Sequence, residues 1–250
     1  VLLLAEKKQR VDELSEGLAI YPVRGREFLN CDPEQLFKAP QAINGRTVEG
    51  KWTRALLPPS TLSLLDGLLE EKAVRHFDDI AEVDVGIVTG ANKFFLIGDE
   101  TVERFGLEEF AHPMFGRSEH CPGIIYDDVQ HRSNAANGMP TNFVWFQDDS
   151  VERNLFARIY IQLGEKENLH TRYKCRIRQP WYKVPSVYAT EIGMLKRAHD
   201  MPRLILNKIG AYTTDTAYRI RIKEVTAHQL VYNFINALTA LSAELEGRRS

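Results

Sequence analysis

The side chains of this sequence that stand out as candidate functional groups are positively charged and recur at a regular spacing. Residues 170–223 hold 12 basic and three acidic side chains, a net charge of +9, whereas the rest of the chain carries −11. Basic residues occupy every second position at Arg172, Lys174, Arg176 and Arg178, and again at Arg219, Arg221 and Lys223. Such a concentration of positive charge favours a polyanionic partner. The pattern therefore predicts contact with nucleic acid.

Residues that could catalyse a reaction do not form a recognisable motif. The sequence has no glycine-rich nucleotide-binding motif and no nucleophile elbow. None of its seven histidines is paired at the spacing of a zinc-binding helix. His112, His120 and Cys121 are near one another but make a weak case for zinc. We expect this part of the protein to bind a partner and not to catalyse a reaction.

Strands are expected to position the cations. Successive side chains on a strand point to opposite faces. Residues 172–178 would then place four cations on one face and Tyr173, Cys175 and Ile177 on the packed face. Residues 217–222 repeat the pattern, so two basic-faced strands would form a cradle for nucleic acid.

Apolar spacing predicts the other elements. Further strands are expected at residues 1–5, 17–23, 80–88, 94–97 and 203–209, and helices at residues 60–71, 150–163 and 226–245. Ser60 and Ser150 are the expected N-caps of the first two helices, and Thr226 with Gln229 forms a capping box for the third. The apolar face of the second helix is expected to comprise Val151, Leu155, Ile159 and Leu163. This mixture predicts an α+β fold with central strands and flanking helices.

Composition limits the class of protein. With 44% hydrophobic and 26% charged residues, the chain resembles folded domains and not disordered ones. Its three scattered cysteines argue against a disulfide framework and for a reducing compartment. No apolar run approaches the roughly 18 residues that span a bilayer. We expect a cytoplasmic protein without a membrane partner.

Several segments of the sequence match a known family in order and spacing. They are Asp84–Phe95 (DVGIVTGANKFF), Arg172–Tyr182 (RYKCRIRQPWY), Pro202–Lys208 (PRLILNK) and Phe234–Arg248. Together they resemble the target recognition domain of Taq-type, gamma-class adenine-N6 DNA methyltransferases, over roughly residues 50–250. Val1–Lys7 is similar to a strand of the preceding methyltransferase domain. The resemblance implies that residues 1–50 are the tail of that domain, with a short remnant of its sheet and a linker, and that residues 51–250 are the recognition domain.

The resemblance implies sequence-specific binding of double-stranded DNA within a restriction–modification or related defence system. The family's cofactor motif and its Asn/Asp-Pro-Pro-Tyr/Phe catalytic motif are missing, because Pro58-Pro59 is flanked by Leu57 and Ser60. We therefore expect this sequence to be a piece of a longer protein. S-adenosylmethionine would bind in a methyltransferase domain upstream, and this piece would hold no cofactor, metal or catalytic residue. A restriction subunit would be a further partner.

The candidate DNA-binding residues follow from the cations, the turn at residues 89–93 and the resemblance. The set is Thr89, Gly90, Asn92, Lys93, Arg172, Lys174, Arg176, Arg178, Trp181, Tyr182, Asn207, Lys208, Arg219 and Arg221. Gly90 either allows the backbone to approach a phosphate or belongs to an ordinary hairpin turn. Lys93 and Arg178 are expected nearest the bases, because each would end a strand beside a turn. Trp181 and Tyr182 lie against DNA or fold back as core, and core burial is favoured for Trp181.

Two other functions remain open from the sequence. Glu119, Asp127 and Asp128 could bind magnesium in a nuclease or restriction fragment, which metal-dependent DNA cleavage would reveal. The basic segment could instead belong to an RNA-binding or protein-interaction module. Competition by single-stranded RNA at equal salt would favour that module.

Overall fold

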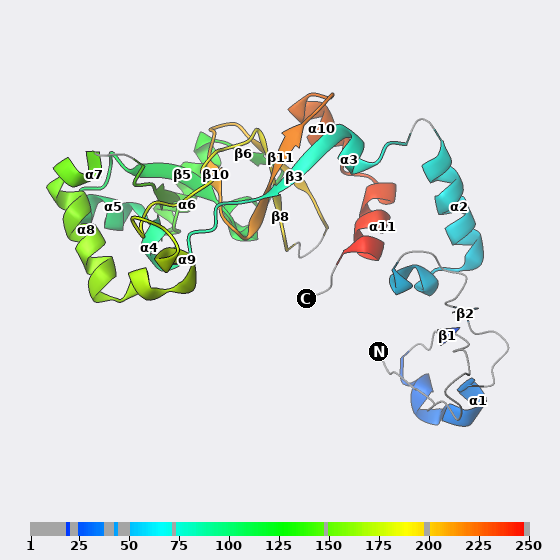
Figure 1. Cartoon of the computed structure of the whole chain (residues 1–250). Coiled ribbons are helices and arrows are strands. Elements are labelled where there is room, and N and C mark those ends of the chain that lie inside the picture. Colours follow the sequence, from blue (N-terminus) through cyan, green and yellow to red (C-terminus); the bar gives the residue numbers. More distant parts are fainter. Residues whose placement is uncertain are drawn as a thin grey trace. The chain divides into compact units, whose positions relative to one another are not determined.

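The chain forms two compact units in a computed structural model, residues 1–75 with 241–250 and residues 76–240. The structure describes residues 19–20, 25–37, 43–44, 51–71, 74–147, 150–197 and 201–247 (Figure 1). The strand expected at residues 1–5 lies outside these ranges, as does most of the strand expected at residues 17–23. Helices and mixed sheets occur together, which confirms the predicted α+β class.

The smaller unit is built from short elements and one longer helix. Its elements are β1 (Ala19–Ile20), η1 (Glu27–Asn30), α1 (Pro33–Phe37), β2 (Ile43–Asn44), η3 (Trp52–Leu56) and α2 (Pro59–Glu70). β1 and β2 pair in antiparallel fashion. Pro59 is the first residue of α2, a position where its missing amide hydrogen costs nothing, so the N-cap is Pro58 and not Ser60. The end of α11 (Ala237–Glu246) belongs to this unit, where the Thr53 hydroxyl donates to the Leu245 carbonyl.

A five-stranded sheet forms one half of the larger unit. Its strand order is β3 (Ala81–Val85), β11 (Ala217–Ile222), β8 (Ile192–Leu195), β9 (Leu204–Asn207) and β6 (Ile125–Tyr126). Neighbouring strands are antiparallel except β6 and β9. The α10 helix (Ala227–Asn233) buries Leu230 and Val231 against this sheet and begins with the predicted capping box of Thr226 and Gln229.

A four-stranded sheet forms the other half of the larger unit. Its order is β10 (Tyr212–Thr213), β5 (Ala111–Phe115), β7 (Asn142–Val144) and β4 (Leu96–Ile97). The helical elements of the unit, besides α10, are α3 (Phe77–Ile80), α4 (Asn92–Phe95), α5 (Asp99–Phe105), η4 (Ser118–His120), α6 (Asp128–Ala136), α7 (Ser150–Arg153), α8 (Leu155–Lys166), η5 (Leu169–Thr171) and α9 (Tyr173–Arg176). In Figure 1, α4, α5, α7, α8 and α9 gather at the end of the unit away from α10.

The helix predicted over residues 150–163 is two helices with a different buried face. Asn154 interrupts it and caps α8 by accepting a hydrogen bond from the Ala157 amide. The residues that α8 buries are Ala157, Tyr160, Ile161 and Gly164, whereas the predicted Leu155, Ile159 and Leu163 are exposed. The buried face of α8 is the one that holds Tyr160, because the Tyr160 ring stacks on Phe94 at a centroid distance of 4.5 Å. The aromatic core therefore selected the face that holds Tyr160.

Three further sequence predictions need correction. Residues 94–97 are not one strand: Phe94 and Phe95 end the helical turn α4, and only Leu96 and Ile97 form β4. The last helix divides into α10 and α11. The third correction concerns residues 172–178, which are helical from Tyr173 to Arg176 and not extended.

Residues 172–178 satisfy part of their backbone hydrogen bonding locally instead of pairing as a strand. The Arg172 carbonyl accepts from the amides of Cys175 and Arg176, both at 2.9 Å, so the backbone is satisfied within one turn. Of the three residues expected to pack, only Cys175 is buried, while Tyr173 and Ile177 are 63% and 62% exposed. Among the residues that the structure describes, no strand pairs with residues 172–178, and an alternating sequence needs such a neighbour to stay extended.

Candidate nucleic-acid interface

A turn at Thr89–Lys93, in which Thr89 and Ala91 are buried, supports the candidate interface. Gly90 has a φ of +78°, a conformation that glycine adopts without strain. The Thr89 hydroxyl accepts from the Ala91 amide at 3.1 Å and lies against the Asn92 side chain. Asn92 also donates to Asp215 at 3.3 Å. The turn is thus fixed by its own side chains, and it starts α4, which exposes Lys93.

The α9 helix packs directly on this turn, although the two segments lie more than 80 residues apart in the sequence. A β-carbon added to Gly90 would come within 2.6 Å of the Lys174 β-carbon. The Arg178 guanidinium donates to the carbonyls of Val88 and Thr89, at 2.6 and 2.8 Å. Burial lowers the pKa of this guanidinium. Arg178 is therefore a clamp between the two segments, and it follows a helical turn instead of ending a strand.

The outward side of α9 combines charge with apolar surface. Its exposed residues, here called the α9 surface, are Arg172, Tyr173, Lys174, Arg176 and Ile177. Lys174 and Arg176 each lie 5.6 Å from the centre of the Tyr173 ring. Within the described ranges, none of the three cations forms an ion pair with a carboxylate. The α9 surface is therefore positively charged and available to a partner.

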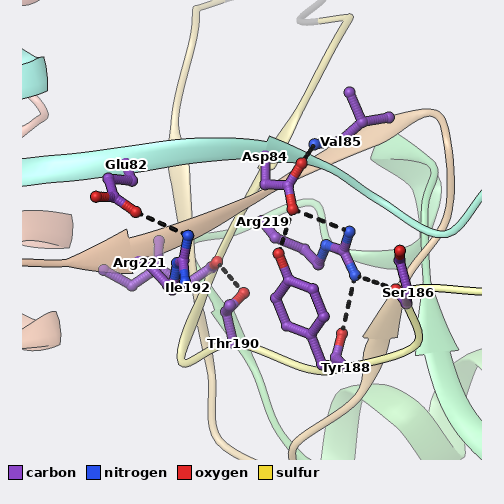
Figure 2. Close-up of polar contacts among 9 residues, drawn as sticks. All are labelled: Glu82, Asp84, Val85, Ser186, Tyr188, Thr190, Ile192, Arg219 and Arg221. Carbon is purple, nitrogen blue, oxygen red and sulfur yellow. Dashed lines mark hydrogen bonds and ion pairs between the residues drawn. The ribbon is translucent and has the colours of Figure 1, made fainter.

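The second basic strand, β11, is neutralised by its neighbour. In the antiparallel register, Arg219 faces Asp84 and Arg221 faces Glu82 of β3. Arg221 lies 2.8 Å from Glu82, and both side chains are more than half exposed. Figure 2 shows both pairs on adjacent strands. The predicted basic face of β11 is therefore not uniformly cationic. The carboxylates that balance its charge lie on β3, which comes from a distant part of the sequence.

Arg219 is not a surface cation: it is buried and links neighbouring segments of the chain. Its side chain is 3% exposed and lies over the Tyr188 ring, 3.6 Å from the ring centre. It donates to the Ser186 carbonyl at 2.6 Å and to Asp84 at 3.3 Å (Figure 2). The hydrogen bond from the Tyr188 hydroxyl lowers the pKa of the Asp84 carboxyl, and Arg219 and Arg221 lower it further. These contacts hold the segment around Ser186 and Tyr188 against the sheet.

The remaining candidate residues divide between core and surface. Trp181 is buried, as favoured from the sequence, and donates to Glu165 at 3.1 Å. Tyr182 is half-buried and packs edge-on against Phe146. Asn207 is buried and bonds to the carbonyls of Thr190 and Ala211 and to the Ala211 amide, so it fixes a turn. The neighbouring Lys208 is exposed.

Asp127 and His120, two of the residues weighed for metal binding, have other contacts. Asp127 caps α6 by accepting from the Gln130 amide at 2.9 Å. His120 accepts from the Gly116 amide at 3.2 Å, and burial lowers the pKa of its imidazole to about 4. Burial likewise raises the pKa of the Cys121 thiol to about 11. Among the residues that the structure describes, no three His, Cys, Asp or Glu side chains are grouped as a metal site.

Sequence reasoning missed Tyr173 and Ile177 as surface residues. They stand four positions apart, which places them on one side of a helix, but alternation with the cations also fits the period of a strand. Nothing in the local pattern separates these two interpretations. Only the position of Cys175 beneath the Thr89–Lys93 turn shows which side of α9 is covered.

Comparison with known proteins places most of the chain in one family model. Residues 49–250 match the model described as the C-terminal domain of the Type II methyltransferase M.Eco57I. No curated protein shows a significant match to the chain. In the part of the chain that the structure covers, no helix is both long and apolar enough to cross a membrane.

Proposed function

The chain belongs to the family of the C-terminal domain of the Type II methyltransferase M.Eco57I, and we propose that it is the target recognition domain of an adenine-N6 DNA methyltransferase. Its role would be to bind double-stranded DNA at a specific sequence. A C-terminal domain of a Type II methyltransferase fits a role in DNA recognition. The Taq-type, gamma-class assignment is part of the proposal.

The observation that carries the proposal is the α9 surface. Three cations without carboxylate partners among the described residues stand on and beside a helical turn that packs on residues 88–90, which suits electrostatic contact with phosphates. Lys93 and Lys208 are further exposed cations of the same unit. Arg178, Arg219 and Asn207 instead support the elements that carry the interface. We therefore assign DNA contact first to Arg172, Lys174 and Arg176.

A separate recognition domain has a physical purpose in adenine methylation. An enzyme that modifies a base must first turn it out of the duplex, at a cost of a few kcal/mol. Contacts with the neighbouring phosphates and base edges can offset that cost and select the sequence. The domain would thus hold the duplex while the chemistry takes place in a methyltransferase domain of the longer protein.

S-adenosylmethionine is the cofactor that this function implies, and we place its site outside the residues described. Glu82, an acid that could hold a ribose in the hollow beside β3 and β11, is already paired with Arg221. We therefore assign no methyl-transfer step to these residues. When bound elsewhere in the longer protein, the cofactor would supply the methyl group.

The binding proposal is tested with the 250-residue chain and fluorescently labelled duplexes from a random pool. We expect duplex DNA to bind and a short sequence to be enriched over successive rounds of selection. Single-stranded RNA that competes as well as duplex DNA at equal salt would favour an interaction module instead. Magnesium-dependent cleavage of the duplex would favour the nuclease alternative.

The methyl-transfer proposal is tested with the longer protein that we expect around this sequence. Radiolabelled S-adenosylmethionine should transfer label to adenine N6 in duplexes that carry the enriched sequence. Label on cytosine, or none on duplexes that the protein binds, would contradict the assignment to adenine-N6 methylation.

A further inference from the structure

Tyr173 and Ile177 form an exposed apolar pair among the cations of the α9 surface. They are 63% and 62% exposed, Tyr173 being the first residue of α9 and Ile177 its C-cap, four residues further on. Cys175, between them in sequence, is fully buried, so the pair faces away from the core. Large apolar groups on a charged surface are informative when they occur together, because they indicate a partner with apolar surface of its own.

The charges around this pair restrict what the partner can be. Arg172, Lys174 and Arg176 lie on the same turn, and two of them approach the Tyr173 ring. A matching partner must present negative charge on either side of an apolar or aromatic centre. A groove of duplex DNA does so, because phosphates line its walls and base edges, including thymine methyl groups, form its floor.

The size and anchoring of α9 favour the major groove. A helix with side chains is about 10–12 Å across, which matches the roughly 12 Å width of the major groove and exceeds the roughly 6 Å of the minor groove. Arg178 and the Gly90 contact hold α9 in place. A fixed element loses little conformational freedom on binding, so more of its contact energy appears as affinity.

We propose that α9 enters the major groove, with Tyr173 and Ile177 against the base edges and Arg172, Lys174 and Arg176 on the flanking phosphates. Ile177 contacts the C5 methyl group of a thymine. This inference rests on the proposed function and deepens it by naming the residues that select the sequence. It replaces Lys93 and Arg178 as the expected base contacts.

The first experiment compares variants of the full chain in the same selection from random duplexes. Tyr173→Ala and Ile177→Ala should each lower affinity for the enriched site by roughly 5- to 50-fold and relax preference at one or two adjacent positions. Tyr232→Ala and Ile235→Ala are matched controls, since both residues are exposed in the same unit, at 53% and 42%. Arg172→Ala should weaken binding to all sequences alike.

A second experiment isolates the thymine contact. Replacing thymine by uracil at the position that Ile177 affects should weaken binding by the wild-type chain. The same replacement should not weaken binding by Ile177→Ala further, because the contact is already lost. Unfolding midpoints in urea that match the wild type would show that the variants are folded.

The outcomes separate the two proposals. If the wild-type chain binds duplexes but Tyr173→Ala and Ile177→Ala leave affinity and preference unchanged, or lose affinity evenly across sites, the α9 assignment is wrong and the proposed function stands. If the wild-type chain binds no duplex, both fall. Binding to phosphatidylserine vesicles that Tyr173→Ala abolishes, with duplex binding unchanged, would assign the α9 surface to a lipid membrane and overturn the inference.

Discussion

Arg172 and Arg178 carry the same charge six residues apart, but their surroundings give them different roles. Arg172 is exposed, whereas Arg178 uses its guanidinium on two backbone carbonyls. Arg219 is likewise occupied, by the Ser186 carbonyl and Asp84. A guanidinium whose terminal nitrogens already donate to protein oxygens has little capacity left to bind a phosphate. At the scale of single residues, burial and hydrogen bonding therefore separate cations that support the interface from those that can form it.

Replacement of Arg178 should destabilise the protein and weaken DNA binding without changing sequence preference. Arg178→Ala removes two charge-assisted hydrogen bonds, so the free energy of unfolding should fall by roughly 1–3 kcal/mol in urea denaturation. Arg178→Lys keeps the charge but not the planar pair of donors, and should recover only part of the loss. Wild-type stability with a loss of preference at one base pair would instead identify Arg178 as a base contact.

His120 should make the protein less stable as the pH falls from neutrality. Its pKa is 6.5 as a free side chain and about 4 in the folded protein, because burial disfavours the charged form and Arg117 adds to this. The unfolded chain therefore takes up a proton over this interval while the folded chain does not. The contribution is fully present above pH 6.5 and is lost as the pH falls towards 4.

The size of this effect can be measured by urea unfolding between about pH 7.5 and about pH 5. His120 should contribute a decrease on the order of 2 kcal/mol in the free energy of unfolding over that range. His120→Asn keeps an acceptor for the Gly116 amide but does not titrate, so its pH dependence should be flatter by that amount. Identical pH dependence in the two proteins would contradict the assignment.

At the scale of elements, α9 depends on the glycine beneath it. Gly90→Ala introduces a methyl group 2.6 Å from the Lys174 β-carbon at a φ of +78°. Gly138→Ala is a matched control, because Gly138 has a φ of +70° and nothing within 4 Å of the added carbon. The control should lose about 1–2 kcal/mol of unfolding free energy, and Gly90→Ala roughly 1–3 kcal/mol more.

DNA affinity should follow the same order as stability for these two glycine variants. Displacement of α9 would weaken DNA binding by Gly90→Ala and leave Gly138→Ala unaffected. Equal losses of stability for the two variants would show that α9 can move without cost. Unfolding in urea and anisotropy titrations with duplex DNA provide both measurements.

The β3–β11 pair predicts a contrast between two arginines on one strand. Arg219→Met leaves the Ser186 and Tyr188 carbonyls without their donor, so it should lower the free energy of unfolding by roughly 2–4 kcal/mol. Arg221→Ala breaks only an exposed ion pair and should cost about 0–1 kcal/mol. Both are measured by urea unfolding, and equal costs would contradict the distinction between buried and exposed pairs.

At the scale of the whole molecule, the free cations set the salt dependence of DNA binding. If Lys93, Arg172, Lys174 and Arg176 each meet a phosphate, the log–log slope of affinity against salt should be roughly −3 to −4. Arg172→Ala should flatten the slope by about one, whereas Arg221→Ala should leave it unchanged, because Arg221 is already paired with Glu82. A wild-type slope near zero in anisotropy titrations would show that these cations do not face DNA.

The sequence predicted those parts of the structure whose cause is local. β11 spans the predicted residues 217–222, and the capping box at Thr226 appears as expected. The α2 helix also lies within one residue of its predicted bounds. In each case, apolar period or a capping side chain acts over a few residues. The mixed α+β class follows from the same kind of information.

Tertiary structure alone decided which cations are free and which face of each helix is buried. Alternation at residues 172–178 fits a strand as well as it fits α9, and only the packing of Cys175 under the turn at Thr89 selects the helix. The sequence gives no reason to treat Arg219 and Arg221 differently from free cations. The pairing of β3 with β11 places carboxylates from more than 130 residues away beside both of them. The sequence by itself determined the amount of positive charge in residues 170–223. Its availability was decided by contacts between distant segments, because neutralisation and burial depend on neighbours in space.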